Sequence, residues 1–163
     1  MKAIIIDDER LARQELKNLL AAHKEIEVVA ECANAEEAKA KIAEISPDVI
    51  FLDIQMPGKT GLELLEEISA LPEVVFVTAY DEYAIRAFEI NALDYLLKPV
   101  QPQRLAETVK KLLNKEAGDK KENNSPLQDN DQVFVKDGEK CWFVSLNNIR
   151  LFESEGNYVR VYF

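Results

Sequence analysis

The chain has 163 residues, 47% hydrophobic and 31% charged, which is typical of a globular protein with one domain or one domain plus part of another. No apolar run approaches the roughly 20 residues of a membrane-spanning helix, and the N-terminal run reaches Asp7 too early for a signal peptide, so we expect a cytoplasmic protein without a membrane partner. The net charge of −10 lies in residues 1–131, since residues 132–163 carry four basic and four acidic residues, and such an acidic region repels nucleic-acid phosphates.

Residues 1–115 alternate five short apolar runs with five stretches of helical periodicity. The apolar runs predict strands at Ala3–Ile6, Val28–Ala30, Val49–Leu52, Val74–Val77 and Asp94–Leu97. The periodic stretches predict helices at Arg10–Ala22, Ala35–Ile45, Leu62–Ala70, Asp81–Ile90 and Pro102–Asn114. This alternation predicts an α/β fold with a doubly wound parallel sheet, covered by helices on both faces.

Two of the predicted helices carry further signals. Asn34 precedes the second helix and is a predicted N-cap, with acidic residues in the first turn that follows it. The first helix has leucines at helical spacing, and we expect one buried face formed by Leu11, Leu16, Leu19 and Leu20.

The rest of the chain has a different character. Residues 116–131 are polar and without periodicity, so they predict a linker. Beyond them, Val133–Val135 and Cys141–Val144 predict a β-hairpin around the turn signal Asp137-Gly138. Further strands are predicted at Ile149–Phe152 and Tyr158–Phe163, which makes residues 132–163 a short all-β fragment.

Polar residues follow four of the five strands: Asp7 and Asp8, then Asp53, Thr78 and Lys98. In a parallel sheet of the flavodoxin-like order 2-1-3-4-5 these ends share one edge, with the ligand crevice between the first and third strands. Two carboxylates about 4 Å apart repel by roughly 1 kcal/mol in water and about 4 kcal/mol at an effective dielectric of 20. A hard divalent cation such as Mg²⁺ relieves that repulsion, and the added lysine and hydroxyl suit a phosphoryl group on Asp53.

Each of these residues also has a simpler structural explanation. The acidic run after the first strand is a candidate cap for the first helix, and Asp53 is a candidate Asx-turn residue. Thr78 is a common β-former, Lys98 is a typical surface lysine, and Tyr95 is a typical core residue. The combination, in this order and at these strand ends, favours the phosphoryl-binding interpretation.

A set of motifs spans residues 2–115: Asp7-Asp8, Asp53 with Met56-Pro57-Gly58 and Gly61, Thr78-Ala79, and Asp94-Tyr95-Leu96-Leu97-Lys98-Pro99. With these motifs the region resembles a response-regulator receiver domain of two-component signalling, with a flavodoxin-like (βα)5 fold. The resemblance implies that Asp53 accepts a phosphoryl group from a sensor histidine kinase. It also implies that Lys98 contacts the phosphoryl oxygens and that Thr78 and Tyr95 form a switch pair.

The same resemblance implies Mg²⁺ as the cofactor. Asp8, Asp53 and the backbone carbonyl of Gln55 would bind the ion directly, and Asp7 would bind it through water. Such a domain catalyses only its own phosphorylation and dephosphorylation, so it is not expected to be an enzyme in the ordinary sense.

Two alternatives remain open from the sequence. A phosphatase with an aspartyl-phosphate intermediate has a second aspartate two residues after its nucleophile, and Gln55 occupies that position here. A phosphorylation-independent interaction module would keep the acidic residues without using them.

The C-terminal residues carry a second resemblance, through Val133–Gly138 and Glu153–Val159. They are similar to the opening of a LytTR-type DNA-binding domain, and the pattern around Thr78–Glu89 is similar to receivers of that subfamily. We therefore expect a receiver domain over residues 1–115, a linker over 116–131 and an incomplete LytTR domain over 132–163. This implies a transcriptional regulator that dimerises on phosphorylation and binds DNA through the complete output domain.

Overall fold

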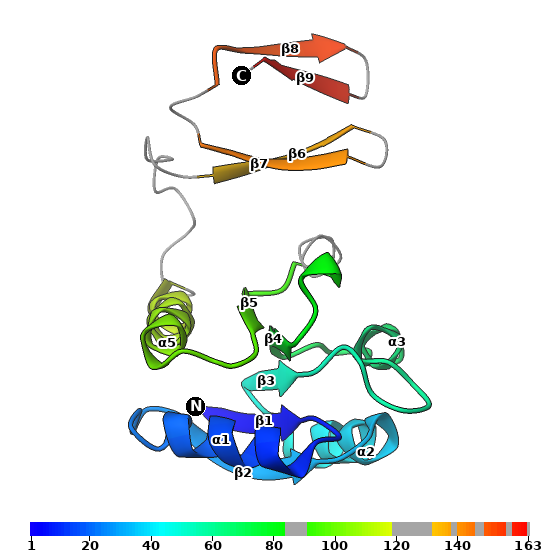
Figure 1. Ribbon diagram of the computed structural model, residues 1–163, viewed down its shortest axis with the longest axis vertical. Helices are drawn as coiled ribbons and strands as arrows, with labels where there is room; N and C mark the ends of the chain where they lie inside the picture. The colour runs from blue at the N-terminus through cyan, green and yellow to red at the C-terminus, as the bar shows by residue number, and fades with distance from the viewer. Residues whose placement is uncertain (84–90, 119–131, 138–139, 146–148, 156–157, 163) are drawn as a thin grey trace. The chain divides into compact units, whose positions relative to one another are not determined.

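A computed structural model describes residues 1–83, 91–118, 132–137, 140–145, 149–155 and 158–162 (Figure 1). The chain divides into two compact units, Met1–Lys120 and Lys121–Phe163. Among the described helices, none combines the length and the apolar character that crossing a bilayer requires.

The first unit is built on a five-stranded parallel sheet in the order β2-β1-β3-β4-β5. Its strands are β1 (Lys2–Ile6), β2 (Glu27–Cys32), β3 (Val49–Leu52), β4 (Glu73–Thr78) and β5 (Asp94–Leu97). The helical elements are α1 (Arg10–Leu20), α2 (Ala35–Ile45), α3 (Gly61–Glu66), the short 3₁₀ helix η1 (Asp81–Tyr83) and α5 (Pro102–Gly118). The predicted flavodoxin-like order is confirmed, and the place where β1 and β3 meet is the switch point of the sheet.

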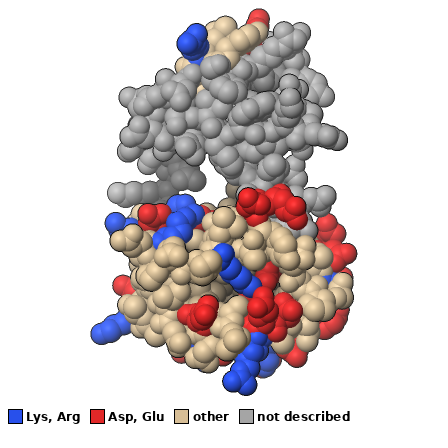
Figure 2. Space-filling view, in the orientation of Figure 1, with Lys and Arg blue, Asp and Glu red and all other residues tan. Residues whose placement is uncertain are grey.

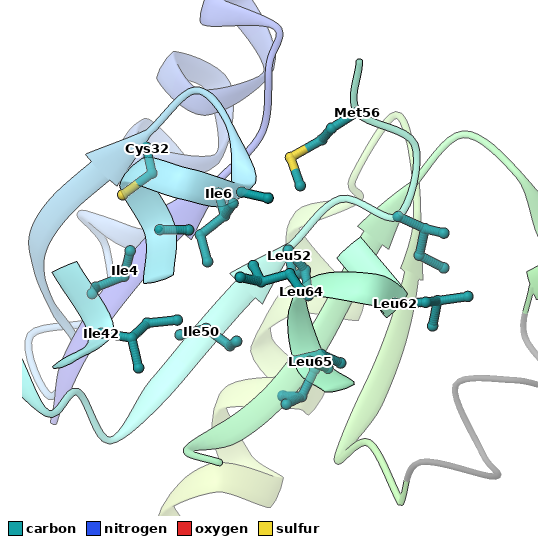
Figure 3. Close-up of a cluster of buried hydrophobic side chains, with 14 of the residues drawn as sticks. Ile4, Ile6, Cys32, Ile42, Ile50, Leu52, Met56, Leu62, Leu64 and Leu65 are labelled. Carbon is teal, nitrogen blue, oxygen red and sulfur yellow. The ribbon is translucent and has the colours of Figure 1, made fainter. Parts of the chain in front are cut away.

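The core lies on both faces of the sheet, because successive strand residues point to opposite sides. Ile4 and Ile6 of β1 pack with Ile42 of α2 and Leu65 of α3 in one buried cluster (Figure 3). The alternate strand residues pack against α1 and α5 in a second cluster, whose members include Ile5, Phe51, Leu16, Leu20, Leu105 and Val109. The sheet is therefore buried on both sides, and its strand ends are held by a packed core.

Several helix ends differ from the sequence predictions. α3 ends at Glu66 rather than Ala70, and the N–H groups of Glu67 and Ile68 donate to carbonyls only three residues back. Consecutive acidic residues at 66 and 67 oppose the negative end of the helix dipole, which favours this early ending. At the other extreme, α5 continues to Gly118 through good helix formers, and Lys115 in its last turn makes an ion pair with Glu73 (2.7 Å).

Two further predictions concern the buried face of α1 and the helix expected at Asp81–Ile90. Leu11 was expected on the buried face of α1, but 73% of its surface is exposed, so that prediction was wrong. Leu16 and Leu20 carry the burial instead, since they lie four residues apart on the stripe that faces the sheet. Of the helix predicted at Asp81–Ile90, the structure shows η1, and residues 84–90 lie outside the described part of the chain.

The second unit contains two antiparallel pairs of strands. β6 (Gln132–Asp137) pairs with β7 (Lys140–Ser145), and Asp137 opposite Lys140 closes the ladder, which confirms the predicted hairpin. β8 (Leu151–Glu155) pairs with β9 (Tyr158–Tyr162), so the first of these strands begins two residues later than predicted.

The described surface of the first unit carries acidic side chains in several groups, with basic side chains among them (Figure 2). On the coloured part of that face there is no broad basic patch. This agrees with the excess of acidic residues that the sequence places before residue 132.

Candidate functional site

The polar residues predicted at the strand ends meet at one edge of the sheet. β1 and β3 lie in register, and the N–H of Asp53 donates to the carbonyl of Ile6 (2.9 Å), which places Asp7 beside Asp53. At the far side, the N–H of Lys98 donates to the carbonyl of Thr78 (2.8 Å). The sheet therefore assembles residues that are up to 91 positions apart in the chain.

Lys98 is the central cation of this edge. Its Nζ lies 2.7 Å from Asp7 Oδ2 and 2.9 Å from Asp53 Oδ2, with Glu9 Oε1 further away at 3.7 Å. Burial alone would lower the pKa of Lys98, but hydrogen bonds to the two aspartates outweigh burial and raise this pKa above its usual value. The alternative of a solvated surface lysine is therefore wrong, because the ammonium is a half-enclosed counter-ion.

Asp7 and Asp53 are both buried and both have structural bonds as well. Asp7 Oδ1 accepts from the N–H of Glu9 (2.9 Å), and Asp53 Oδ1 accepts from the N–H of Gln55 (3.2 Å). The Asx-turn suggested for Asp53 is thus present beside its pairing with Lys98. Burial raises the pKa of Asp7, although the hydrogen bonds from Lys98 and Glu9 act in the opposite direction.

The acidic run does not cap α1 in the way that the sequence suggested. The N-cap residue is Glu9, and its side chain makes no capping hydrogen bond. Asp7 and Asp8 instead remain at the sheet edge, Asp7 buried and Asp8 exposed. The capping explanation for these two acids is therefore wrong.

Three carboxylates share a small volume. One oxygen from each of Asp7, Asp8 and Asp53 lies within 4.8 Å of the other two. Lys98 offsets only part of this negative charge, and the three atoms that could ligate a metal ion are all carboxylate oxygens. Mg²⁺ commonly binds through one or two carboxylates together with waters and a substrate phosphate, so the donor set fits this ion.

A cavity of about 400 Å³ opens over these residues. Its walls are Asp8, Glu9, Asp53, Gln55, Met56, Pro57, Ala79, Tyr80 and Lys98. Thr78 lies at the adjacent end of β4, fully buried, and its hydroxyl has no hydrogen-bond partner among the residues that the structure describes. A buried hydroxyl without a partner is costly, and an anion held near it would supply the missing acceptor.

Tyr95 lies on β5, the edge strand beside β4. Its ring is half-buried and packs against Phe76 with centroids 6.4 Å apart, while its hydroxyl donates to the carbonyl of Tyr80. Tyr95 is therefore partly a core residue, and its polar end contacts a residue of the cavity wall.

Gly61 fixes the loop that follows Asp53. Its N–H donates to the carbonyl of Ile54 (2.8 Å), and a Cβ at position 61 would lie 2.3 Å from the carbonyl oxygen of Asp53. Thr60 and Glu63 close a capping box at the start of α3. Only a glycine allows this helix to begin so close to the Asp53 backbone.

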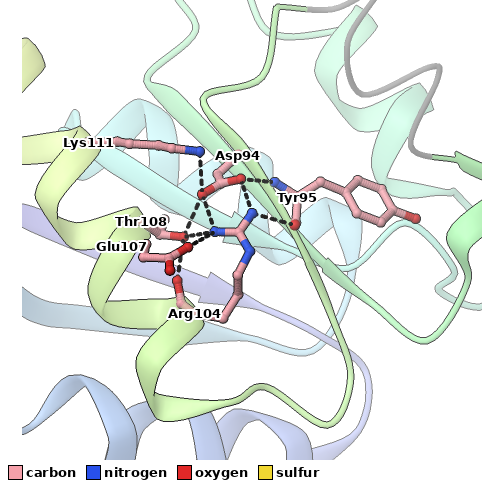
Figure 4. Close-up of polar contacts among 6 residues, drawn as sticks. All are labelled: Asp94, Tyr95, Arg104, Glu107, Thr108 and Lys111. Carbon is pink, nitrogen blue, oxygen red and sulfur yellow. Dashed lines mark hydrogen bonds and ion pairs between the residues drawn. The ribbon is translucent and has the colours of Figure 1, made fainter. Parts of the chain in front are cut away.

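The sequence analysis missed a second polar cluster, around Asp94 (Figure 4). Asp94 accepts from Arg104 (2.8 and 2.5 Å), Thr108 (2.7 Å) and Lys111 (3.2 Å) of α5. Burial would raise the pKa of Asp94, but the hydrogen bonds, chiefly from Arg104, lower it to about 2. The signal was present, because residues 104, 108 and 111 share one helical face.

Comparison with known proteins decides the family. The family model for the response regulator receiver domain matches residues 3–110, which include every residue of the acidic edge and of the cavity. This chain belongs to the response regulator receiver family. The receiver domain is thus the part of the chain that contains the sheet, the acidic edge and the cavity.

Three similar proteins illustrate the relationship. A response regulatory protein of Vibrio cholerae is 55% identical over 129 residues, which are 78% of this chain and 53% of that protein. The transcriptional regulatory protein BtsR of Salmonella typhi is 47% identical over 136 residues, which are 82% of this chain and 56% of that protein. The crystal structure of the response regulatory domain of mrkE from Klebsiella pneumoniae matches 71% of this chain and 97% of its own, with a TM-score of 0.65 and 37% identity. The chain spans about half the length of the two full-length relatives.

Proposed function

We propose that the receiver domain accepts a phosphoryl group on Asp53 from a sensor histidine kinase and thereby regulates transcription. The observation that carries this proposal is the sharing of one ammonium group, that of Lys98, by two buried carboxylates. A purely structural ion pair needs one carboxylate for each cation. Here the surplus negative charge lies at the edge where this fold binds ligands. The Thr78 hydroxyl, for which the described residues provide no hydrogen-bond partner, lies at the same edge.

The proposed reaction is an in-line displacement at phosphorus. A carboxylate oxygen of Asp53 forms the new P–O bond while the P–N bond to the kinase histidine breaks, and the leaving imidazole nitrogen takes a proton from solvent. Lys98 stabilises negative charge on the phosphoryl oxygens, and the Thr78 hydroxyl donates to one of them. Lys98 already lies 2.9 Å from Asp53 Oδ2, whereas Thr78 would move towards the phosphoryl oxygens after the transfer.

Asp8, Asp53 and the backbone carbonyl of Gln55 would hold Mg²⁺ directly, and Asp7 would act through water. This division is supported by Asp7, whose two carboxylate oxygens already bind Lys98 and the Glu9 N–H. When bound, Mg²⁺ would neutralise charge on the phosphoryl oxygens that face the acidic edge.

The response is proposed to pass through Thr78 and Tyr95. Movement of Thr78 towards the phosphoryl oxygens would let Tyr95 rotate and reshape the surface near β5, a two-state element biased by local charge. We propose residues 1–115 as the receiver, 116–131 as the linker and 132–163 as the first part of a LytTR-type domain. The complete protein would dimerise on phosphorylation and bind DNA. Its role in transcription is supported by the name of the relative BtsR, a transcriptional regulatory protein.

Acetyl phosphate with Mg²⁺ provides a direct test. Asp53→Asn should abolish phosphate incorporation, because the amide cannot form the acyl phosphate. Asp48→Asn is the matched control, since Asp48 is exposed and lies directly before the same strand, and it should keep wild-type incorporation. Unchanged incorporation in Asp53→Asn would refute the assignment, and steady-state hydrolysis of small phosphate esters would favour the phosphatase alternative.

A further inference from the structure

Arg13 connects α1 to the end of β1 and to β2, next to the acidic edge. Its Nη1 donates to the main-chain carbonyl of Asp7 (2.6 Å), and its Nε lies 3.7 Å from Glu31 Oε1 on β2. Only 15% of the side chain is exposed, so this cation is held close to the site rather than in solvent. The side chain faces the sheet because position 13 shares a helical face with the buried Leu16 and Leu20.

The contact fixes the backbone from which Asp8 projects. The carbonyl of Asp7 belongs to the planar peptide unit that joins Asp7 to Asp8, so its direction fixes the position of the Asp8 Cα from which the side chain projects. The N–H of Asp7 donates to the carbonyl of Cys32 (3.0 Å). With the side-chain bonds to Lys98 and Glu9, Asp7 is held at four points, and Arg13 supplies the one nearest to Asp8.

We propose that Arg13 is a positioning residue for the cation site, which presets Asp8 for Mg²⁺ before the ion binds. The inference rests on the proposed function. A charge-assisted hydrogen bond to a carbonyl is among the stronger kinds, and loss of an outer partner of a metal ligand typically lowers metal affinity about 10–100-fold. Arg13 touches neither the ion nor the phosphoryl group, so its effect should appear in binding rather than in the chemical step.

Lys17 offers a matched control on the same helix. It lies one turn further along α1 and binds the same Glu31 through its Nζ (2.9 Å), but about half of its side chain is exposed. Removing Lys17 therefore removes a cation of equal charge from the same acceptor, while the bond to the Asp7 carbonyl stays intact.

The test measures Mg²⁺ affinity by calorimetry in four proteins: the wild type, Arg13→Met, Arg13→Lys and Lys17→Met. We expect the dissociation constant to rise about tenfold in Arg13→Met and about threefold in Arg13→Lys, whose single ammonium replaces only part of the contact, and to stay within twofold in Lys17→Met. Phosphate incorporation from acetyl phosphate in Arg13→Met should return to the wild-type level at saturating Mg²⁺. Thermal unfolding with EDTA checks that each variant folds.

The outcomes separate the two proposals. If the wild type binds Mg²⁺ and Arg13→Met has the same affinity but lower thermal stability, Arg13 is only structural and the inference fails alone. If Arg13→Met does not fold, equal affinities of Arg13→Lys and Lys17→Met overturn it. If the wild type itself binds no Mg²⁺, the proposed cation site fails, and the role of Arg13 fails with it.

Discussion

In the described part of the chain, buried aspartates form two clusters, one at the start of β5 around Asp94 and one beyond its end around Lys98. The two clusters compensate the buried negative charge in different ways. At the acidic edge, Asp7 shares the single ammonium of Lys98 with Asp53, and burial raises its pKa. Against α5, Asp94 alone receives hydrogen bonds from two cations and a hydroxyl, which hold its pKa at about 2.

This difference distinguishes a candidate binding site from a structural cluster. Asp94 has more positive partners than it has charge, so the cluster is electrostatically satisfied and fastens α5 to β5. The acidic edge has more carboxylates than cations, which is the arrangement that the proposed Mg²⁺ site requires. The number of cations for each carboxylate, rather than the depth of burial, distinguishes the two clusters.

The largest expected effect tests how closely the acidic edge depends on backbone packing. Gly61→Ala should destabilise the protein by about 3 kcal/mol, because its Cβ would overlap the Asp53 carbonyl and backbone atoms must move. Initial rates of phosphate incorporation should fall as well. Gly58→Ala is the control, since φ is +83° but the space is open, and it should cost only about 1–2 kcal/mol. Equal urea midpoints for the two variants would contradict the close-contact argument.

The second prediction sets the two clusters against each other. Asp94→Asn should lower the free energy of unfolding by about 2–3 kcal/mol, because strong hydrogen bonds to a charged acceptor are lost. Asp7→Asn, measured in EDTA, should raise it by about 1 kcal/mol, because one of three crowded carboxylates becomes neutral. Urea denaturation of both variants gives the signs directly. If both substitutions changed the free energy of unfolding in the same direction, the two clusters would not differ in their charge balance as described.

The third prediction is a pH dependence that belongs to Asp94. Its folded pKa of about 2 is below the usual 3.8, so the ionised form stabilises the fold above about pH 4 and this contribution is lost as pH falls towards 2. The stability advantage of the wild type over Asp94→Asn should shrink by about 2 kcal/mol between pH 5 and pH 2. Guanidinium unfolding at several pH values measures it, and a constant difference would show that Asp94 is not the titrating group.

The sequence predicted the sheet and its acidic edge because both depend on local patterns. Runs such as Val49–Leu52 are apolar on both faces, and each ends at a polar residue that the parallel order then aligns. Leu11 was misplaced because helical spacing alone cannot tell which side of a broad apolar stripe meets the sheet.

The polar contacts of Arg13 and Asp94 were harder to predict. Arg13 binds a main-chain carbonyl, and Asp94 binds side chains from a helix that begins eight residues later, so neither contact follows from composition. Both had a signal, which is a polar residue on a face that is otherwise apolar. From the sequence, Gly61 was visible only as a motif residue, because a close approach of two backbones is a property of the folded chain.

The length of α5 has a practical consequence for protein engineering. The helix continues to Gly118, and Lys115 in its last turn binds Glu73 at the start of β4. A chimera that joins a foreign effector domain after position 114 would lose the Lys115–Glu73 ion pair, and the helix would end without its basic residue. A junction placed after Lys120 keeps the whole first unit, so exchange of output modules should start there.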